Sequence, residues 1–408
     1  MNDLAPITAA SAFAALVPQP ADALLALIKE FASDPRTDKL DLGVGVYRDE
    51  FGVCTIPAAV KEAERRLLVE QATKGYLGSD GDIRFVARIA HLVLGEDAEI
   101  GGPLIGVQTP GGGGALRLAA ELYHRASPGG RIWIGTPTWP NHAPIFNASG
   151  VPIVAHPFYD PVTSELLFDE MMAALEGAAV GDAILIHGCC HNPTGAGFSR
   201  AQWQRLIGII VERRLLPIVD LAYHGLGDGL DADAESTRAI FASVPDAMLA
   251  YSCDKNFALY RDRVGALLIQ APTAEAAGIA RGNLLAIARA AWSMPPDHGA
   301  AVVRIILDDP ELAASWEAEL ATMRSRINAV RAVLGAAHPR LASIGQQRGM
   351  FALLPLTPAD VTQARHDSAI YMASDGRINI AGLREDTVPY LVDAIRPWLD
   401  RAAADGGN

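Results

Sequence analysis

Short apolar runs alternate with longer amphipathic segments through the middle of the chain. The short runs are continuously apolar and rich in β-branched residues, which is typical of strands that helices cover on both faces. Because strands that alternate with helices form βαβ units, the pattern predicts an α/β fold with a mostly parallel seven-stranded sheet between helices. The predicted strands are residues 104–109, 131–135, 151–157, 183–189, 216–221, 247–252 and 264–270.

Two of the intervening helices are marked by their first residues. Ser199 and Gln202 have the spacing of a capping box and predict a helix over residues 201–213. Asp309 followed by a proline has the form of an N-cap with Pro at the first helical position, and it predicts a long helix over residues 311–337.

The tail of the chain has a different pattern. After residue 323 a helix is followed by two short apolar runs, residues 350–356 and 377–381, and by a terminal helix near residues 387–402. This pattern predicts a smaller α+β domain formed by both termini, bridged to the large domain by the helix 311–337. The expected division is residues 1–54 as an N-terminal arm and part of the small domain, 55–322 as the large cofactor-binding domain, and 323–408 as the small C-terminal domain.

Composition and charge narrow the classes of function. The chain has 408 residues, half of them hydrophobic, and a net charge of −13 without a basic cluster, which argues against nucleic acid or an anionic membrane as partner. The first basic residue is Lys29, and no apolar run reaches the ~20 residues of a membrane span. The four cysteines lack the spacing of a metal site or a disulfide framework. We therefore expect a cytoplasmic protein without a bound metal.

Polar residues follow the predicted strands, where ligands of α/β sheets bind. Four glycines, 111–114, precede a helix predicted at residues 115–125 and suit a phosphate, although a plain tight turn is an equal alternative. Lys255 follows the strand 247–252; such a lysine is usually a surface charge, but in a site that excludes water it can attack a carbonyl. Arg263 could share a phosphate with Ser252.

Two further strand ends carry a carboxylate and an amide. Asp220 ends an apolar strand and needs a partner there; a structural hydrogen bond is the plain explanation, and a cationic ring nitrogen is the functional one. Asn192 follows the strand 183–189. His187 and His191 lack partner carboxylates in the sequence, so we expect core histidines and no metal site. A phosphate cradle, a carboxylate, a lysine and a hydroxyl at one sheet edge suit pyridoxal phosphate.

Seven motifs in order resemble the fold-type I, class I aminotransferases, in the subgroup that holds aspartate and aromatic aminotransferases. The resemblance covers about residues 42–399. The motifs are LGVGVY at 42–47, KGYLG at 74–78, QTPGG at 108–112, TWPNH at 138–142, HGCCHNPTG at 187–195, SCDK at 252–255 and RINIAG at 377–382.

The resemblance implies pyridoxal 5'-phosphate as cofactor, attached to Lys255 through its aldehyde. It implies that Asp220 pairs with the ring nitrogen, that Asn192 and Tyr223 donate to the ring hydroxyl oxygen, and that Trp139 stacks on the ring. The residues that would hold the phosphate are Ser252, Arg263, Gly112, Gly113 and, from the neighbouring subunit of a homodimer, Tyr76.

The substrate residues are implied in the same way. Arg377 would bind the substrate α-carboxylate, with Gly45, Trp139 and Asn192 around it. Arg289 of the neighbouring subunit would pair with a side-chain carboxylate. The reaction implied is ping-pong transfer of an amino group from an L-amino acid to a 2-oxo acid, with Lys255, Asp220 and Tyr223 as the catalytic set.

The chain departs from the family pattern in the substrate pocket and at the phosphate site. Gly75 and Met294 stand where aspartate-preferring members commonly have Asn. Gly113 stands where the family has Thr or Ser, and Cys253 and Asp254 where it has small or aromatic residues. Because Arg289 is present, the first expectation is aspartate with 2-oxoglutarate. The larger, more apolar pocket makes an aromatic or broad-range aminotransferase the alternative.

Of the other classes of function, one stays open and two are disfavoured by particular features. A β-lyase or a decarboxylase could use the same scaffold, since fold alone does not fix function. A regulator built on this fold would need a basic DNA-binding region, and the chain has no basic patch. A nicotinamide-binding enzyme would need a G-x-G-x-x-G motif after its first strand, which the chain lacks.

Overall fold

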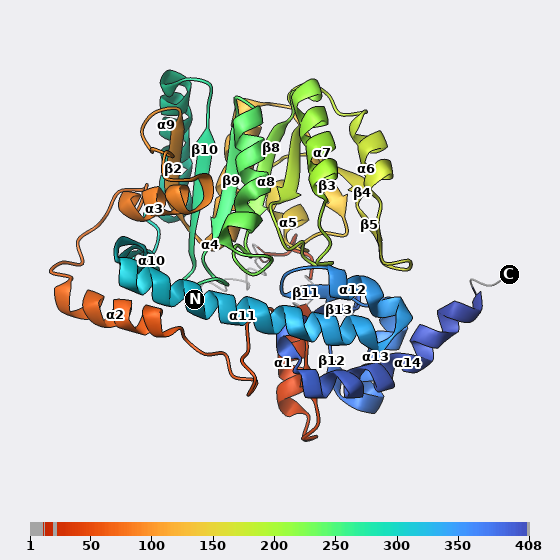
Figure 1. Ribbon diagram of the computed structural model, residues 1–408. Coiled ribbons are helices and arrows are strands. Elements are labelled where there is room, and N and C mark those ends of the chain that lie inside the picture. Colours follow the sequence, from red (N-terminus) through yellow and green to blue (C-terminus); the bar gives the residue numbers. More distant parts are fainter. Residues whose placement is uncertain (1–10, 12, 19–22, 406–408) are drawn as a thin grey trace, which may run out of the picture.

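The computed structural model describes residues 11, 13–18 and 23–405. Seven strands form one sheet in the order β2-β10-β9-β8-β7-β3-β4 (Figure 1). Neighbouring strands are parallel except at β10, which is antiparallel to both β2 and β9. The mostly parallel seven-stranded sheet is confirmed. Its strands are β2 (Leu104–Pro110), β3 (Ile132–Thr136), β4 (Ile153–Pro157), β7 (Ala183–His187), β8 (Leu216–Leu221), β9 (Ala247–Ser252) and β10 (Val264–Gln270).

Helices cover both faces of the sheet, and each face has its own apolar cluster. Along β9, Met248 and Ala250 belong to one cluster, and Leu249 and Tyr251 belong to the other. Because successive side chains of a strand point to opposite faces, a strand in this position must be apolar throughout. One face is covered by α4 (Gly111–Ala126), α5 (His142–Ala148) and α9 (Ala274–Trp292), and the other by α3 (Ile83–Leu94), α6 (Phe168–Leu175), α7 (Arg200–Arg213) and α8 (Leu230–Ser243).

Local sequence signals explain where several helices begin. The Ser199–Gln202 capping box is present at the start of α7. Asp309 caps α11 (Pro310–Ala337), accepting from the backbone N–H groups of Glu311 and Leu312. One expectation is wrong: the four glycines 111–114 do not precede a helix but form the first turn of α4, which starts at Gly111. Close packing explains the glycines there, because a Cβ on Gly112 would lie 3.0 Å from Ser252 Cβ and one on Gly114 would lie 2.8 Å from Pro110 Cδ.

The long helix α11 lies below the sheet and continues through the predicted domain boundary at residue 322 (Figure 1). Beyond it, β11 (Phe351–Leu353) pairs with β13 (Arg377–Asn379), and β12 (Ile370–Tyr371) pairs with β1 (Leu40–Asp41) from the start of the chain. The domain boundaries themselves stay predictions. The other elements are α1 (Ala23–Ser33), α2 (Ala58–Glu70), β5 (Tyr159–Asp160), β6 (Glu165–Leu166), α10 (His298–Asp308), η1 (Pro339–Leu341), α12 (Ala342–Gln346), α13 (Pro358–Ser368), η2 (Ile380–Gly382), η3 (Glu385–Thr387) and α14 (Val388–Asp405).

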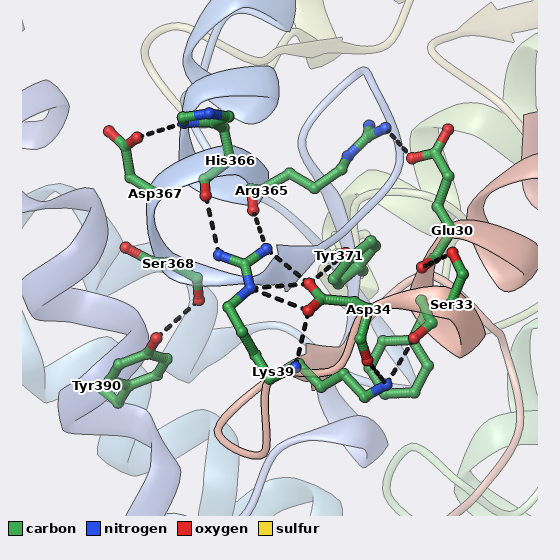
Figure 2. Close-up of polar contacts among 12 residues, drawn as sticks. Glu30, Ser33, Asp34, Lys39, Arg365, His366, Asp367, Ser368, Tyr371 and Tyr390 are labelled. Carbon is green, nitrogen blue, oxygen red and sulfur yellow. Dashed lines mark hydrogen bonds and ion pairs between the residues drawn. The ribbon is translucent and has the colours of Figure 1, made fainter.

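A polar network joins the N-terminal segment to the C-terminal part of the chain (Figure 2). The carboxylate of Asp34 accepts a hydrogen bond from Arg36 Nη2 at 2.6 Å and one from Tyr371 Oη at 2.6 Å. Arg36 also donates to the carbonyls of Arg365 and His366 at 3.1 and 2.8 Å. These contacts give the segment before residue 55 the neighbours that the sequence pattern predicts. Within the described residues, no helix is both long and apolar enough to cross a membrane.

Candidate active site

Three neighbouring parallel strands bring the predicted site residues to one edge of the sheet. Asp220 lies near the end of β8, opposite His187 of β7 and Ala250 of β9. Asn192 follows β7, and Lys255 follows β9. Because parallel strands end at the same edge, residues far apart in sequence meet there.

Asp220 is a buried carboxylate with two histidine neighbours. Its Oδ2 lies 3.2 Å from His142 Nε2 and 3.9 Å from His187 Nε2. An ionised carboxylate can only accept, so His142 donates from Nε2, and its Nδ1 accepts from the Thr138 hydroxyl at 2.8 Å. Burial acts to raise the pKa of Asp220, but the His142 hydrogen bond and the neighbouring His187 and Lys255 together hold it below its ordinary value. Asp220 is therefore ionised and can pair with a cationic group.

Lys255 lies in a site that disfavours its charged form. Its Nζ is 5.6 Å from the centre of the Tyr223 ring and 3.8 Å from Asp254 Oδ2. Burial lowers the pKa of Lys255, although the negative charges of Asp254 and Asp220 oppose that shift. A neutral amine, which can act as nucleophile or base, is therefore more accessible here than on a surface lysine.

The first turn of α4 lies beside Ser252 and Arg263. A Cβ atom on Gly111, whose φ is +69°, would lie 2.6 Å from Arg263 Nη2, and one on Gly112 would lie 3.0 Å from Ser252 Cβ. Side chains at these two glycines would therefore push the guanidinium and the hydroxyl away from the helix N-terminus. The free N–H groups of a first helical turn attract a phosphate. At Gly113 the nearest atom to such a Cβ belongs to Trp139, at 3.9 Å, so that glycine leaves room.

A second cluster joins the sheet edge to the C-terminal part of the chain. Asn192 Nδ2 donates to Tyr223 Oη at 3.1 Å, and Arg377 Nη1 donates to Asn192 Oδ1 at 3.4 Å. The Arg377 guanidinium lies 4.7 Å from the centre of the Phe351 ring. A Cβ on Gly45 would lie 2.5 Å from Phe351 Cζ, so only glycine fits beside that ring. Gly45, Asn192, Tyr223 and Arg377 thus meet as expected.

Tyr76 and Arg289 lie on the surface of the chain. Tyr76 is 97% exposed, and Arg289 is exposed with Ser293 Oγ, 3.1 Å away, as its hydrogen-bond partner. The backbone N–H of Leu77 contacts Met294 Sδ at 3.0 Å, so the segments that carry Gly75 and Met294 lie side by side. Their role in the site of a neighbouring subunit stays a prediction.

His142 is a site residue to which the sequence analysis assigned no role. It lies at the start of α5, is fully buried, and packs edge-on against Trp139 with ring centres 5.2 Å apart. The signal was available, because a buried strand-end carboxylate needs a partner and His142 lies in a quoted motif. The expectation that His187 lacks a carboxylate neighbour is wrong. A ring nitrogen of His142, a ring nitrogen of His187 and a carboxylate oxygen of Asp220 all lie within 4.8 Å of one another. The absence of a metal stays a prediction.

Arg331 was also missed, because nothing in a helical pattern marks a buried cation. It is 1% exposed and donates from Nε and Nη2 to the carbonyl of Gly349 at 2.9 and 2.7 Å, from Nη1 to that of Ile344 at 3.3 Å, and also to that of Phe351. Burial lowers the pKa of Arg331 to about 9. Arg331 thus holds the segment that carries Phe351, whose ring lies beside the Arg377 guanidinium.

Replacing Arg331 with methionine is expected to lower the free energy of unfolding by about 3 kcal/mol or more, because several buried carbonyls lose a charged donor at once. Urea denaturation would measure the loss. Arg200→Met is the matched control, since Arg200 is exposed and pairs with exposed Glu235; its effect should stay within about 0.5 kcal/mol. Equal effects of the two substitutions would contradict the role of Arg331.

The residues brought together fit pyridoxal phosphate. An amine with a lowered pKa, an anionic carboxylate, a phenol paired with an amide, and an anion site at a helix N-terminus all face one sheet edge. These are the groups that an aldehyde, a protonated ring nitrogen, a ring hydroxyl and a phosphate require. Two observations support the fit: the chemistry of these side chains, and the space that Gly111 and Gly112 leave beside Arg263 and Ser252.

Comparisons with known proteins agree with this arrangement. Residues 37–395 match the family model for class I and II aminotransferases. The chain is 51% identical over 377 residues to a tyrosine aminotransferase of Rhizobium meliloti, covering 91% of this chain and 96% of that protein. It is 41% identical over 384 residues to an aspartate aminotransferase of Haemophilus influenzae, covering 92% and 97%. A solved aromatic-amino-acid aminotransferase of Burkholderia pseudomallei, covalently bound to pyridoxal phosphate, superposes with a TM-score of 0.92 at 37% identity, covering 96% and 100%.

Proposed function

The chain belongs to the class I and II aminotransferase family, and we propose that its preferred amino donors are aromatic L-amino acids, with a 2-oxo acid such as 2-oxoglutarate as acceptor. The reaction itself is pyridoxal-phosphate-dependent transamination. The sequence pattern put aspartate first and aromatic donors as the alternative. The most similar relatives reported above support the alternative better, because the tyrosine aminotransferase matches more closely than the aspartate aminotransferase.

The observation that carries the substrate proposal is the pair of departures at Gly75 and Met294. The two segments contact each other through Met294 Sδ and the Leu77 N–H. Gly75 and the thioether of Met294 stand where aspartate-preferring members of the family have Asn. The pocket therefore offers apolar surface where a substrate carboxylate would need hydrogen-bond donors. An aromatic ring benefits from such a surface. Arg289 is the one feature that favours aspartate as the second candidate, because a guanidinium pairs with a carboxylate.

The roles of the residues follow from their geometry. When bound, pyridoxal phosphate supplies an aldehyde for the amino group and a ring that accepts the electron pair left at the substrate Cα. We assign Arg377 to the substrate carboxylate, which it can bind through two parallel hydrogen bonds. The Lys255 amine moves the proton at Cα. Because Asn192 donates to Tyr223 Oη, the phenol proton is free to be donated to the ring oxygen.

Replacing Arg289 with leucine is expected to lower kcat/KM for aspartate about 100-fold and that for phenylalanine less than about threefold, because only the former presents a side-chain carboxylate. Steady-state kinetics with 2-oxoglutarate would measure both. Arg281→Leu is the control on the same helix, since Arg281 pairs with Asp80. Equal losses on both substrates would remove the side-chain role of Arg289. A native enzyme that prefers aspartate over phenylalanine and tyrosine would overturn the aromatic proposal.

We propose a homodimer with shared sites. Its support is the number of exposed apolar side chains between residues 51 and 69, shortly before Tyr76 in the chain, since exposed apolar surface marks interfaces. They are Phe51, Val53, Ile56, Leu68 and Val69, which are 79%, 53%, 50%, 85% and 74% exposed.

Mixing two variants that each turn over aspartate poorly tests the shared site. A dimer of one Lys255→Ala subunit and one Arg289→Leu subunit has one site with both native residues. Random exchange makes half of the dimers mixed, and one of two sites is intact in each, so about a quarter of native aspartate turnover should return. No recovery, in a mixture shown by mass spectrometry to contain mixed dimers, would place both residues in one subunit's site. We also propose a cytoplasmic location, supported by four cysteines that are all free thiols.

A further inference from the structure

Asn379 is a fully buried amide two residues after Arg377 on β13. It is 0% exposed, and its Nδ2 donates to the backbone carbonyls of Val44 and Val46 at 2.7 Å each. Its Oδ1 accepts from the N–H of Ala381 at 3.1 Å, so the nitrogen of the amide, and not its oxygen, faces the two carbonyls. The amide thus uses both of its N–H donors on one segment from the start of the chain.

The two carbonyls flank Gly45, which is the centre of a tight turn. The N–H of Val46 donates to the carbonyl of Val44 at 2.9 Å, which is the i to i+2 pattern of a γ-turn. A Cβ atom on Gly45 would lie 2.5 Å from Phe351 Cζ, so the turn packs directly against that ring. Among the described residues the N–H of Gly45 donates to no other group, and it is therefore available to a ligand.

Arg377 and Asn379 share one face of a short β-ribbon. In the antiparallel pair of β13 and β11, Asn379 lies opposite Phe351, and Arg377 lies opposite Leu353. Because side chains two residues apart on a strand point to the same side, Arg377, Asn379 and Phe351 face the same way. The Arg377 guanidinium lies 4.7 Å from the centre of the Phe351 ring, against which Gly45 also packs. One strand therefore carries both the arginine and the anchor of the glycine turn.

We propose that Asn379 is a positioning residue for the substrate: it holds the Gly45 turn at a fixed place beside Arg377, so that both can contact the substrate α-carboxylate. This inference rests on the proposed function, because it takes Arg377 and Gly45 as the residues at that carboxylate. Asn379 itself is fully buried and acts only through the turn. Its effect should therefore appear in the binding of the carboxylate, and not in the proton transfer assigned to Lys255.

The substitution Asn379→Asp tests this role, because a carboxyl group has the shape of the amide and lacks its two N–H donors. A protonated carboxyl group offers one donor for two carbonyls, and an ionised one offers none. We expect KM for phenylalanine and KM for aspartate to rise about tenfold or more, while kcat stays within about threefold. The inhibition constant of 3-phenylpropionate, a carboxylate without an amino group, should rise by a similar factor, because its only charged group is the carboxylate.

Gln270→Glu is the matched control. The Nε2 of Gln270 donates to the carbonyls of Phe241 and Val244 at 2.8 Å each, which is the same arrangement at the end of β10 that lies away from Ser252. This substitution also removes two donors from a pair of carbonyls, so urea denaturation can compare the stability that each variant loses. KM, kcat and the inhibition constant of Gln270→Glu should stay within about twofold of the native values.

Each outcome decides one question. A folded Asn379→Asp variant with the native KM and inhibition constant would overturn the positioning role. A fall in kcat without a rise in KM, or equal changes in Asn379→Asp and Gln270→Glu, would overturn it as well, because these are the effects of general structural damage. If Asn379→Asp does not fold, Asn379→Ser decides, because a hydroxyl has one donor for two carbonyls; native binding of 3-phenylpropionate by this variant would contradict the role.

Failure of the proposed function gives different results. A native preference for aspartate would overturn only the aromatic proposal, because both substrates carry the α-carboxylate that the inference concerns. An unchanged inhibition constant of 3-phenylpropionate in Arg377→Leu would place the carboxylate elsewhere, and would overturn the assignment of Arg377 together with the inference that rests on it.

Discussion

Replacing Lys255 with alanine is expected to lower kcat/KM for transamination by about 10⁴-fold or more. The substitution removes both the amine to which the cofactor aldehyde is assigned and the base that moves the proton at the substrate Cα, and losses of groups that act together are of this order. Coupled assays of 2-oxo acid release, with phenylalanine and with aspartate, would measure the loss. The absorbance of the bound cofactor should change as well, because its aldehyde loses the amine.

The control for this substitution is Lys61→Ala. Lys61 is an exposed residue of α2, and its replacement should leave kcat/KM within about twofold. Covalent attachment gives a second readout that does not depend on turnover. Borohydride reduction followed by peptide mass mapping should find the cofactor covalently attached to Lys255 in the native protein and no attached cofactor in the alanine variant. Native activity in Lys255→Ala would exclude the assigned role of the amine.

The sheet could be predicted from the sequence because burial leaves a simple pattern. Helices cover both faces of the sheet, so most of its strands are short runs of buried and largely apolar residues, and all seven appear in the structure. The exception is β4 at the edge of the sheet, where Ala155 and Pro157 are exposed. The carboxyl-end rule then brought Asp220, Asn192 and Lys255 together without knowledge of the strand order. The antiparallel orientation of β10 could not be predicted, because an apolar run does not show in which direction its strand crosses the sheet.

The contacts that tune the site were not predictable, because they join residues that no local pattern connects. His142 and Asp220 are 78 residues apart, and Arg331 reaches the carbonyls of a segment that follows its own helix. Asp254 appeared only as a departure from a family pattern. In the structure its carboxylate pairs with the guanidinium of Arg263. Sequence reasoning thus found the polar groups that meet at the sheet edge, and missed the contacts that shift their pKa values.

Replacing Asp220 with asparagine is expected to lower kcat by about 10²–10⁴-fold, the range associated with a positioned acid or base. An amide has no charge with which to hold a proton on the ring nitrogen, whereas Asp220 stays ionised because its pKa is held below the ordinary value by His142 and His187 against the effect of burial. Asp220→Glu should keep part of the rate. Saturating phenylalanine and 2-oxoglutarate would isolate kcat, and retention of more than a tenth of the native value by the asparagine variant would contradict the assignment.

The substitution His142→Asn tests the charge of Asp220 while the Asp220 side chain itself is kept. The hydrogen bond from His142 favours the ionised carboxylate, so its loss should raise the pKa of Asp220. A carboxylate with a raised pKa is protonated at a higher pH. The acid side of the kcat profile should therefore move towards neutral pH in His142→Asn, while kcat at pH 8 falls only about tenfold or less. A purely structural role for His142 would lower kcat equally at every pH and leave the profile where it is, so the displacement of the acid limb, and not the loss of rate, is the measurement that identifies a charge held on Asp220.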